Sequence, residues 1–303
     1  MVGSGEIVAS AFRQGLMVPA FNIPYLPMVK PVVQAVADED AFAFIAVARP
    51  EWIKFEAIGP AAVAEEFAKW EDPEHVRLHL DHVPVLDEDG LHVDFIPIFR
   101  EAIALGYQSI MIDASRLDLD GNIQATRQVA DMAHAAGIAC EAELGAILGH
   151  EAGPLPSYDQ LFASGMGFTD VAEAERFVQE AGCDWLSVAI GSVHGAISGA
   201  AKNKQKIEAR LNLEHLKRLR QATGIPLVLH GGSSVKRDML LSAVELGIAK
   251  VNVATEIRQA YEAVLREGGQ VAEAQQTVYD CTIWLLRDYF AISGTSQCLT
   301  TQA

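Results

Sequence analysis

Residues 213–232 read LEHLKRLRQATGIPLVLHGG, and this stretch holds one complete copy of the pattern that decides the fold. Its first half, residues 213–223, is amphipathic at helical spacing, and Gly224 stands where such a helix would stop. Residues 226–230 form an apolar run that is too short for a helix, which predicts a strand. A helix, a glycine stop and a short strand therefore follow one another directly.

The same alternation recurs along the whole chain. Eight short apolar runs predict strands at residues 17–22, 42–48, 77–82, 109–113, 139–144, 185–190, 226–230 and 250–253. Helical patterns such as residues 171–181, which precede Gly182, lie between them. This alternation predicts an α/β protein with a parallel sheet, and eight units close a (β/α)8 TIM barrel. The alternative is an open doubly wound sheet, but that fold usually has an early G-x-G-x-x-G motif, which is missing here.

Composition limits the classes of protein that the chain can belong to. Half of its 303 residues are hydrophobic and 21% are charged, which excludes disorder as the main state. The length fits two domains of ordinary size or one large α/β barrel, and we expect one domain over 1–303, with a barrel at about 7–262 and C-terminal helices at about 263–292. The net charge of −17 argues against nucleic-acid partners and anionic membranes.

Targeting signals are missing from the sequence. The N-terminus lacks a basic region followed by an apolar one, and no stretch approaches the roughly 18 apolar residues of a membrane span. The four cysteines are scattered without a C-x-x-C motif, as expected of free thiols in a reducing compartment. We therefore expect a cytoplasmic protein with no membrane partner.

Histidines collect at the ends of the predicted strands, where TIM barrels place their chemistry. His82, His194 and His230 each follow a different strand, and Asp81 precedes the first of them. Three neutral imidazoles with an open fourth position are typical of a catalytic zinc site. The alternative is that each is a hydrogen-bonded histidine near the core. Strand periodicity places His79 on the opposite face from His82.

A second group of residues suits a phosphate. In TIM barrels the loops after strands seven and eight often cradle one, because glycines expose backbone N–H groups and a helix start carries partial positive charge. The residues concerned here are Gly231, Gly232 and Ser233 after strand seven and Asn252, Ala254 and Thr255, where strand eight closes and a helix opens, with Gly195 as a further N–H donor. The alternative is a plain helix cap by Ser233 or Thr255. Asn22, at the end of strand one, is a further candidate substrate contact.

Several of these segments resemble one known family. They are DH (81–82), EAELG (141–145), VAIGSVHG (188–195), LVLHGGS (227–233) and KVNVATE (250–256), with further matches at 20–23 and 109–113. In order and spacing they are similar to the class II, metal-dependent ketose-bisphosphate aldolases. The tagatose-bisphosphate and short fructose-bisphosphate aldolase branch is most similar, and the resemblance runs from about residue 7 to 261.

The resemblance implies roles for individual residues. One catalytic Zn²⁺ per chain would be held by His82, His194 and His230, with Glu143 as an alternative ligand. Asp81 corresponds to the acid/base at the bond that is cleaved. Glu151 stands where the family has a loop glutamate that moves a proton, although a solvated loop acid is the other interpretation. The resemblance also implies a monovalent cation near the phosphate.

The implied reaction is the reversible retro-aldol cleavage of a phosphorylated ketose, such as fructose- or tagatose-1,6-bisphosphate, as in glycolysis. The products would be dihydroxyacetone phosphate and an aldehyde, and the enzyme would be a homodimer or homotetramer. Such a cleavage needs an electron sink, either a lysine Schiff base or a metal ion. No lysine ends a predicted strand, and Lys250 stands at the start of strand eight, so the residues favour the metal.

Two departures from the family leave the substrate open. Arg49 follows strand two, where the family usually has small residues, and it could bind an additional anion or form a surface ion pair. Residues 83–94 carry four acids and no Lys or Arg, and they predict an insertion on the rim of the barrel. The alternatives are thus a class II-type aldolase or lyase with a different anionic substrate, or a non-catalytic barrel subunit of an aldolase complex.

Overall fold

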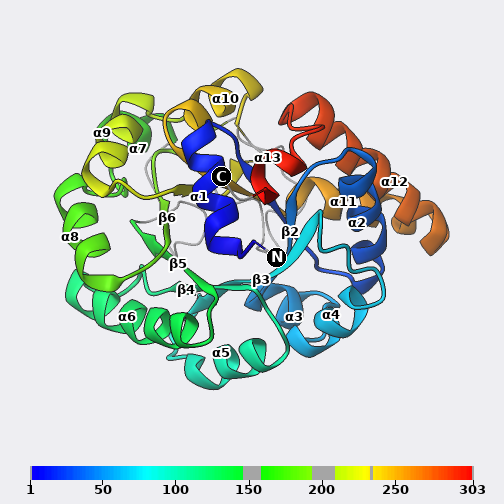
Figure 1. Ribbon diagram of the computed structural model, residues 1–303, viewed down its shortest axis with the longest axis horizontal. Helices are drawn as coiled ribbons and strands as arrows, with labels where there is room; N and C mark the ends of the chain where they lie inside the picture. The colour runs from blue at the N-terminus through cyan, green and yellow to red at the C-terminus, as the bar shows by residue number, and fades with distance from the viewer. Residues whose placement is uncertain (1, 146–157, 193–208, 233–234, 302–303) are drawn as a thin grey trace.

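The structure is a computed structural model and describes residues 2–145, 158–192, 209–232 and 235–301 (Figure 1). Its centre is a closed barrel in which every strand pairs in parallel with the next, and β1 pairs with β8. The strands are β1 (Val18–Asn22), β2 (Ala43–Ala48), β3 (Val76–Pro84), β4 (Ser109–Asp113), β5 (Ala139–Leu144), β6 (Trp185–Val188), β7 (Leu227–Leu229) and β8 (Ile248–Val253). The predicted TIM barrel is therefore confirmed.

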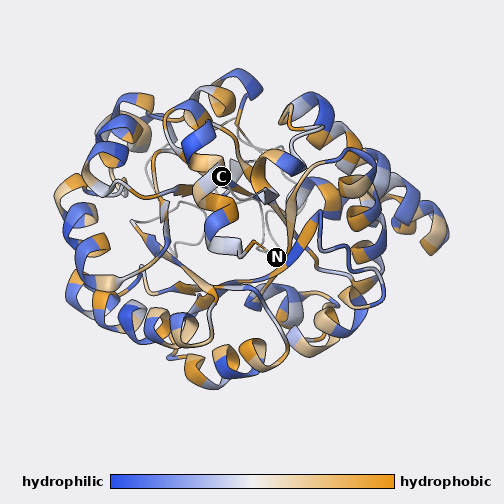
Figure 2. Ribbon diagram, viewed as in Figure 1, coloured by the Kyte–Doolittle hydropathy of each residue, from blue (hydrophilic) through white to orange (hydrophobic). Residues whose placement is uncertain are grey.

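Most helices surround this barrel, while α1 and α13 lie across one end of it (Figure 1). They are α1 (Ser4–Gln14), α2 (Val29–Asp38), α3 (Arg49–Lys54), α4 (Pro60–Phe67), α5 (Phe95–Ala104), α6 (Leu119–Ala135), α7 (Tyr158–Ser164), α8 (Val171–Ala181), α9 (Leu213–Thr223), α10 (Arg237–Glu245), α11 (Thr255–Arg266), α12 (Val271–Trp284) and α13 (Ser296–Thr300), with a short 3-10 helix η1 (Leu26–Met28). Hydrophobic and hydrophilic residues alternate around them, as expected of helices that bury one face (Figure 2).

The helix ends follow the sequence signals. α8 and α9 end at Gly182 and Gly224, which adopt left-handed backbone conformations with φ of 76° and 66°. Glycine adopts this conformation without steric cost, so these two residues stop the helices where the sequence predicts. The side chain of Asp170 accepts hydrogen bonds from the N–H groups of residues 172 and 173 and fixes the start of α8.

The N-terminal helix closes one end of the barrel. Ile7, Val8 and Ala11 of α1 belong to one apolar cluster with Val18 of β1 and Trp185 of β6. α13 lies beside α1 (Figure 1), and the carbonyl oxygen of its Cys298 accepts bonds from Ser10 Oγ at 3.3 Å and Gln14 Nε2 at 2.7 Å. The amino ends of the strands are thus sealed, which leaves the carboxyl ends for the chemistry.

The C-terminal helices pack against the barrel's own outer layer. α12 contacts α11 and α2, and it continues into a π-helical turn, η3 (Leu285–Tyr289). Arg287 of this turn forms an ion pair with Glu39, which follows α2. The backbone of Glu39 also accepts a hydrogen bond from the N–H of Gly294 at 2.9 Å. The predicted C-terminal helical extension is therefore present and tied to the N-terminal half of the barrel.

Residues 83–94 include the end of β3 and a small hairpin between β3 and α5. The N–H of Val93 donates to Val85 at 3.0 Å, and the N–H of Asp87 donates to Leu91 at 2.9 Å. Basic side chains hold the hairpin, because Lys54 Nζ lies 3.0 Å from the Glu88 carboxylate and Arg116 Nη1 donates to the backbone carbonyl of Asp87 at 2.7 Å. The hairpin follows the carboxyl end of β3 and therefore lies on the rim where the site opens.

Over the parts of the chain that the structure describes, no helix combines the length and apolar character that a membrane crossing requires.

Candidate metal and substrate site

A bulge in β3 brings two consecutive residues to the site. Leu80 pairs with Ile110 and Val83 with Ile112, so Asp81 and His82 together oppose the single residue between those two partners. His82 has a φ of 34°, a left-handed conformation that is costly for a residue with a side chain. In a regular strand Asp81 and His82 would point to opposite faces, whereas the bulge lets both serve one site.

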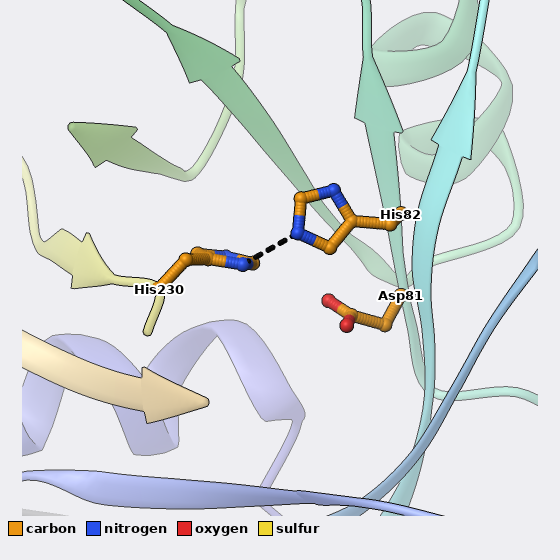
Figure 3. Close-up of side chains that lie close together, drawn as sticks. All are labelled: Asp81, His82 and His230. Carbon is orange, nitrogen blue, oxygen red and sulfur yellow. Dashed lines mark hydrogen bonds between the residues drawn. The ribbon is translucent and has the colours of Figure 1, made fainter. Parts of the chain in front are cut away.

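Two of the predicted histidines face each other across the barrel mouth. Figure 3 shows His82, at the end of β3, pointing toward His230, which follows β7. His82 Nε2 lies 2.6 Å from His230 Nδ1, and one ligand atom from each of Asp81, His82 and His230 lies within 4.8 Å of the others. Nitrogen and oxygen ligands this close together form a candidate metal site.

A carboxylate holds the remote nitrogen of each histidine. His230 Nε2 lies 2.9 Å from Glu141 Oε1, and His82 Nδ1 lies 3.4 Å from Asp113 Oδ2. A carboxylate accepts a hydrogen bond from a ring N–H, so each contact favours a proton on the nitrogen that it holds. The other ring nitrogens, His82 Nε2 and His230 Nδ1, contact each other and face the same point, which is the arrangement that metal-binding histidines need. The donor set therefore fits a divalent metal ion.

Asp81 is buried and held ready as a base. Asn252 Nδ2 lies 2.9 Å from both carboxylate oxygens of Asp81, and Asn22 Nδ2 donates to Oδ2 at 2.9 Å. Burial alone would raise the pKa of Asp81, but the charge of His82, the contact with His79 and the Lys250 ammonium hold it well below its usual value. Asp81 is therefore ionised at neutral pH.

The charges around the two histidines differ. Burial would lower the pKa of His82, but Asp81, Asp113 and Glu143 outweigh it and raise the pKa to about 10. Burial and the nearby His82 lower the pKa of His230 to about 4. The acids that favour a positive charge at His82 favour a bound cation for the same reason.

Glu143 lies next to this site. It is buried, with Ser187 Oγ donating to Oε2 at 3.2 Å, and burial followed by repulsion from Asp113 raises its pKa to about 8. One ligand atom from each of His82, Asp113 and Glu143 also lies within 4.8 Å of the others. Its position is compatible with the predicted alternative ligand.

The turn after β7 has a backbone that requires glycine at two positions. Gly231 has a φ of 68°, which favours glycine, and a Cβ on Gly232 would lie 2.5 Å from Val251 of β8. The carbonyl of Gly232 accepts a hydrogen bond from Tyr289 Oη at 3.3 Å. Nearby, α11 begins at Thr255 directly after Ala254, whose side chain forms no cap. The predicted His194, Gly195, Glu151 and Ser233 lie outside the described residues.

Some residues of the site were not among those predicted. Glu141 and Lys250 are fully buried beneath the two histidines, although alternation along β5 places Glu141 on the same face as Glu143. β8 begins two residues earlier than predicted, so Lys250 lies in its middle and not at its start. Glu51 is also buried, and burial and the charge of Asp81 raise its pKa to about 8.

The prediction for His79 was wrong. Its Nε2 lies 3.6 Å from both Asp81 Oδ1 and Glu141 Oε2, inside the barrel. The side chains of His79 and His82 therefore both lie on the inner face of the sheet. The bulge shifts His82 out of the period of the strand, which the sequence pattern does not reveal.

Arg49 lies at the rim next to the site. It directly follows Ala48, the residue of β2 that pairs in register with Asp81. Its Nη1 lies 3.8 Å from Asp87 Oδ2 of the rim hairpin, and the Arg49 side chain is 23% exposed. This contact is long for an ion pair with hydrogen bonding, so, as far as the described residues show, the guanidinium retains N–H donors for another anion.

Comparisons with known proteins agree with this geometry. A family model described as fructose-bisphosphate aldolase class-II matches residues 2–292. The chain is 31% identical over 270 residues to a fructose-bisphosphate aldolase of Geobacillus stearothermophilus, covering 88% of this chain and 85% of that one. It is 34% identical over 262 residues to a 6-phospho-5-dehydro-2-deoxy-D-gluconate aldolase of Bacillus velezensis, covering 84% and 80%.

A solved structure shows the same fold. The YdjI aldolase from Escherichia coli superposes with a TM-score of 0.76 at 26% identity, over 98% of this chain and 100% of that one. The family match extends over nearly the entire chain and includes every strand of the barrel. The chain therefore belongs to the class II fructose-bisphosphate aldolase family and is a metal-dependent carbon–carbon lyase.

Proposed function

We propose that this enzyme is a zinc-dependent aldolase that reversibly cleaves a phosphorylated ketose to dihydroxyacetone phosphate and an aldehyde. The observation that carries the proposal is the pair of imidazoles, His82 and His230, whose facing nitrogens lie 2.6 Å apart beside the Asp81 carboxylate. Nitrogen ligands favour zinc over hard divalent ions such as Mg²⁺ and Ca²⁺. His194 is the proposed third ligand, by its place in the family motif.

The residues divide the chemistry between them. A bound zinc ion supplies a Lewis acid that stabilises negative charge next to the ketone of the substrate. Asp81, ionised and oriented by Asn22 and Asn252, takes the proton from the hydroxyl at the bond being cleaved. Glu151 is the proposed acid/base for the carbon proton of the donor half.

Phosphate binding is assigned to the loops after β7 and β8. Backbone N–H groups of Gly231 and Gly232 and the start of α11 at Thr255 supply partial positive charge without a buried side-chain cation. Ser233, Gly195, Asn252 and Ala254 complete the proposed contacts. A monovalent cation near the phosphate and a dimeric or tetrameric assembly remain part of the proposal.

The test is removal and return of the metal. Purified protein should contain zinc near one per chain, lose retro-aldol activity with a chelator, and regain it when zinc is restored. Borohydride added with substrate should trap no covalent adduct, because the proposal involves no Schiff base. Full activity in metal-free protein, or a borohydride adduct, would contradict it.

A second candidate substrate is favoured by Arg49. A gluconate substrate, as in the name of the Bacillus velezensis relative, carries a carboxylate on the half that leaves as the aldehyde. Arg49 follows the residue that pairs with Asp81, so it stands on the side where the proposed base meets that half. Guanidinium groups bind carboxylates and phosphates in the same forked geometry.

Condensation reactions separate these candidates. Dihydroxyacetone phosphate would be offered with glyceraldehyde 3-phosphate, with malonic semialdehyde and with uncharged glyceraldehyde. Arg49→Met should lower kcat/KM selectively for whichever anionic aldehyde the wild type prefers, whereas Arg116→Met, which changes the same hairpin's contacts, should not change the preference. Equal loss for charged and uncharged aldehydes would exclude Arg49 from recognition.

A further inference from the structure

Lys250 of β8 is a buried cation for which the reaction as proposed has no use. Its side chain is fully buried, and its Nζ lies 2.8 Å from Glu141 Oε2 and 2.6 Å from Asn252 Oδ1. Trp185 Nε1 also donates to Glu141 Oε2. The ammonium group of Lys250 is thus engaged by Glu141 and Asn252, inside the barrel.

Both partners of Lys250 continue to the reacting groups. The second oxygen of Glu141 contacts His230 Nε2 at 2.9 Å, and the amide nitrogen of Asn252 contacts both oxygens of Asp81 at 2.9 Å. The ammonium group of Lys250 is therefore connected, through one residue in each case, to the candidate metal ligand His230 and to the proposed base Asp81.

The direction of each hydrogen bond follows from the donors and acceptors. An ammonium only donates, so the Asn252 side chain must turn its oxygen to Lys250 and its NH2 group to Asp81. Reversal of this amide would set its oxygen against the Asp81 carboxylate. The same ammonium compensates the buried charge of Glu141. Glu141 can then accept a hydrogen bond from His230 Nε2, and His230 Nδ1 is turned toward His82 Nε2, which lies 2.6 Å away.

We propose that Lys250 is a positioning residue that sets the orientation of the Asn252 amide and the tautomer of His230, and thereby prepares both the base and the metal ligand. This inference rests on the proposed metal-dependent function. A buried ion pair often adds little to stability by itself, so a role in fixing orientation explains why a lysine occupies this position.

The test measures metal binding as well as turnover, with the full-length protein. The Kd for Zn²⁺ is measured by chelator competition in the wild type and in Lys250→Met, which replaces the charged side chain by an uncharged one that is a single atom shorter. The visible absorption of bound Co²⁺ reports the ligand geometry. Lys217→Met, on the exposed side of α9, is the matched control.

We expect Lys250→Met to weaken Zn²⁺ binding by about 10- to 100-fold, the range seen when the support of a metal-binding histidine is removed. Its Co²⁺ spectrum should shift, and kcat should fall more than KM rises. Lys217→Met should match the wild type in all three. A folded Lys250→Met with wild-type Kd, spectrum and kcat would overturn the inference.

The charge-balanced variant Glu141→Gln/Lys250→Met guards against a folding defect, because it leaves no buried charge unpaired. If Lys250 acts through Glu141, this double variant binds Zn²⁺ as weakly as Glu141→Gln alone. Wild-type affinity in the folded double variant, or effects that add, would overturn the inference. A wild type that binds no divalent metal would instead refute the proposed function, so the two failures are distinguishable.

Discussion

At the scale of single residues, the site combines carboxyl groups in opposite states. Asp81 has a pKa held well below its usual value, whereas burial and nearby carboxylates raise the pKa of Glu143 and Glu51 to about 8. The difference follows from their partners, since Asp81 lies next to His82, His79 and Lys250. The proposed base, which must accept a proton, is thus ionised at neutral pH, whereas Glu143 and Glu51 keep their protons.

Asp81→Asn tests the role of this base. The variant keeps the size of the side chain and its contact with Asn22, but it cannot take a proton. We expect kcat to fall by about 10²- to 10⁴-fold, with zinc content unchanged by elemental analysis. Asp89→Asn, on the exposed hairpin, should keep wild-type kcat. Loss of zinc from Asp81→Asn would show that Asp81 is a ligand and not the base.

Glu51 predicts a pH dependence of stability. Between roughly pH 4.5 and pH 8 the folded protein holds a proton on Glu51 that the unfolded chain releases. The folded state then binds more protons, so the free energy of unfolding falls as pH rises through this window. The variant Glu51→Gln has no carboxyl group to titrate at this position, so its free energy of unfolding should not fall in this way. At pH 8 it should be more stable than the wild type by up to a few kcal/mol, with little difference at pH 4.5.

Urea unfolding of the chelated protein at both pH values measures this effect. Glu175→Gln on the exposed face of α8 is the control, and it should change stability equally little at either pH. A Glu51→Gln variant no more stable than the wild type at pH 8 would show that the Glu51 carboxyl is ionised in the folded protein.

At the scale of elements, the sequence was most informative where local rules decide. The apolar runs at 109–113 and 139–144 coincide with β4 and β5, and the glycines after α8 and α9 stop those helices as predicted. The bulge in β3 was not predictable, because no local signal shows that two residues of one strand oppose one of another. Lys250 was misplaced for a similar reason, since strand boundaries depend on pairing partners.

The turn η3 supports the glycine loop and provides a prediction at this scale. Tyr289 Oη donates to the carbonyls of Gly232 and Val235, so the C-terminal extension holds the loop proposed to bind phosphate. Tyr289→Phe should raise KM several-fold, keep kcat within about twofold and cost about 1 kcal/mol of stability. Tyr279→Phe is the control. The Tyr279 hydroxyl donates to Asp38 Oδ2 at 2.7 Å, so this variant also loses one hydrogen bond, but its KM should not change. An unchanged KM in Tyr289→Phe would show that η3 does not contribute to substrate binding through this hydrogen bond.

At the scale of the whole molecule, the charge of −17 and an anionic substrate must be reconciled. Carboxylates crowd the site as well, with Asp81, Asp113, Glu141 and Glu143 all near the two histidines. On the proposed function, a metal ion, backbone N–H groups and Arg49 would supply the positive charge that a phosphorylated substrate meets. The same excess of acid makes the site attract cations. A metal ion that binds only the folded protein stabilises the barrel.

The barrel should fold without its metal but gain stability from it. The interior is closed at the amino end by α1 and filled by an apolar cluster that includes Phe44 and Trp185, so the core does not depend on the ion. Zinc at about 1,000 times its Kd should add about 4 kcal/mol to the free energy of unfolding. Thermal scans with and without chelator measure this gain, and Tm should fall by several degrees on chelation and recover with zinc. The gain should disappear in His230→Ala, which lacks a ligand, while that variant still unfolds cooperatively. A chelated wild type that is unfolded at room temperature would show that the core depends on the ion. A Tm that zinc does not change would show that the metal does not stabilise the barrel.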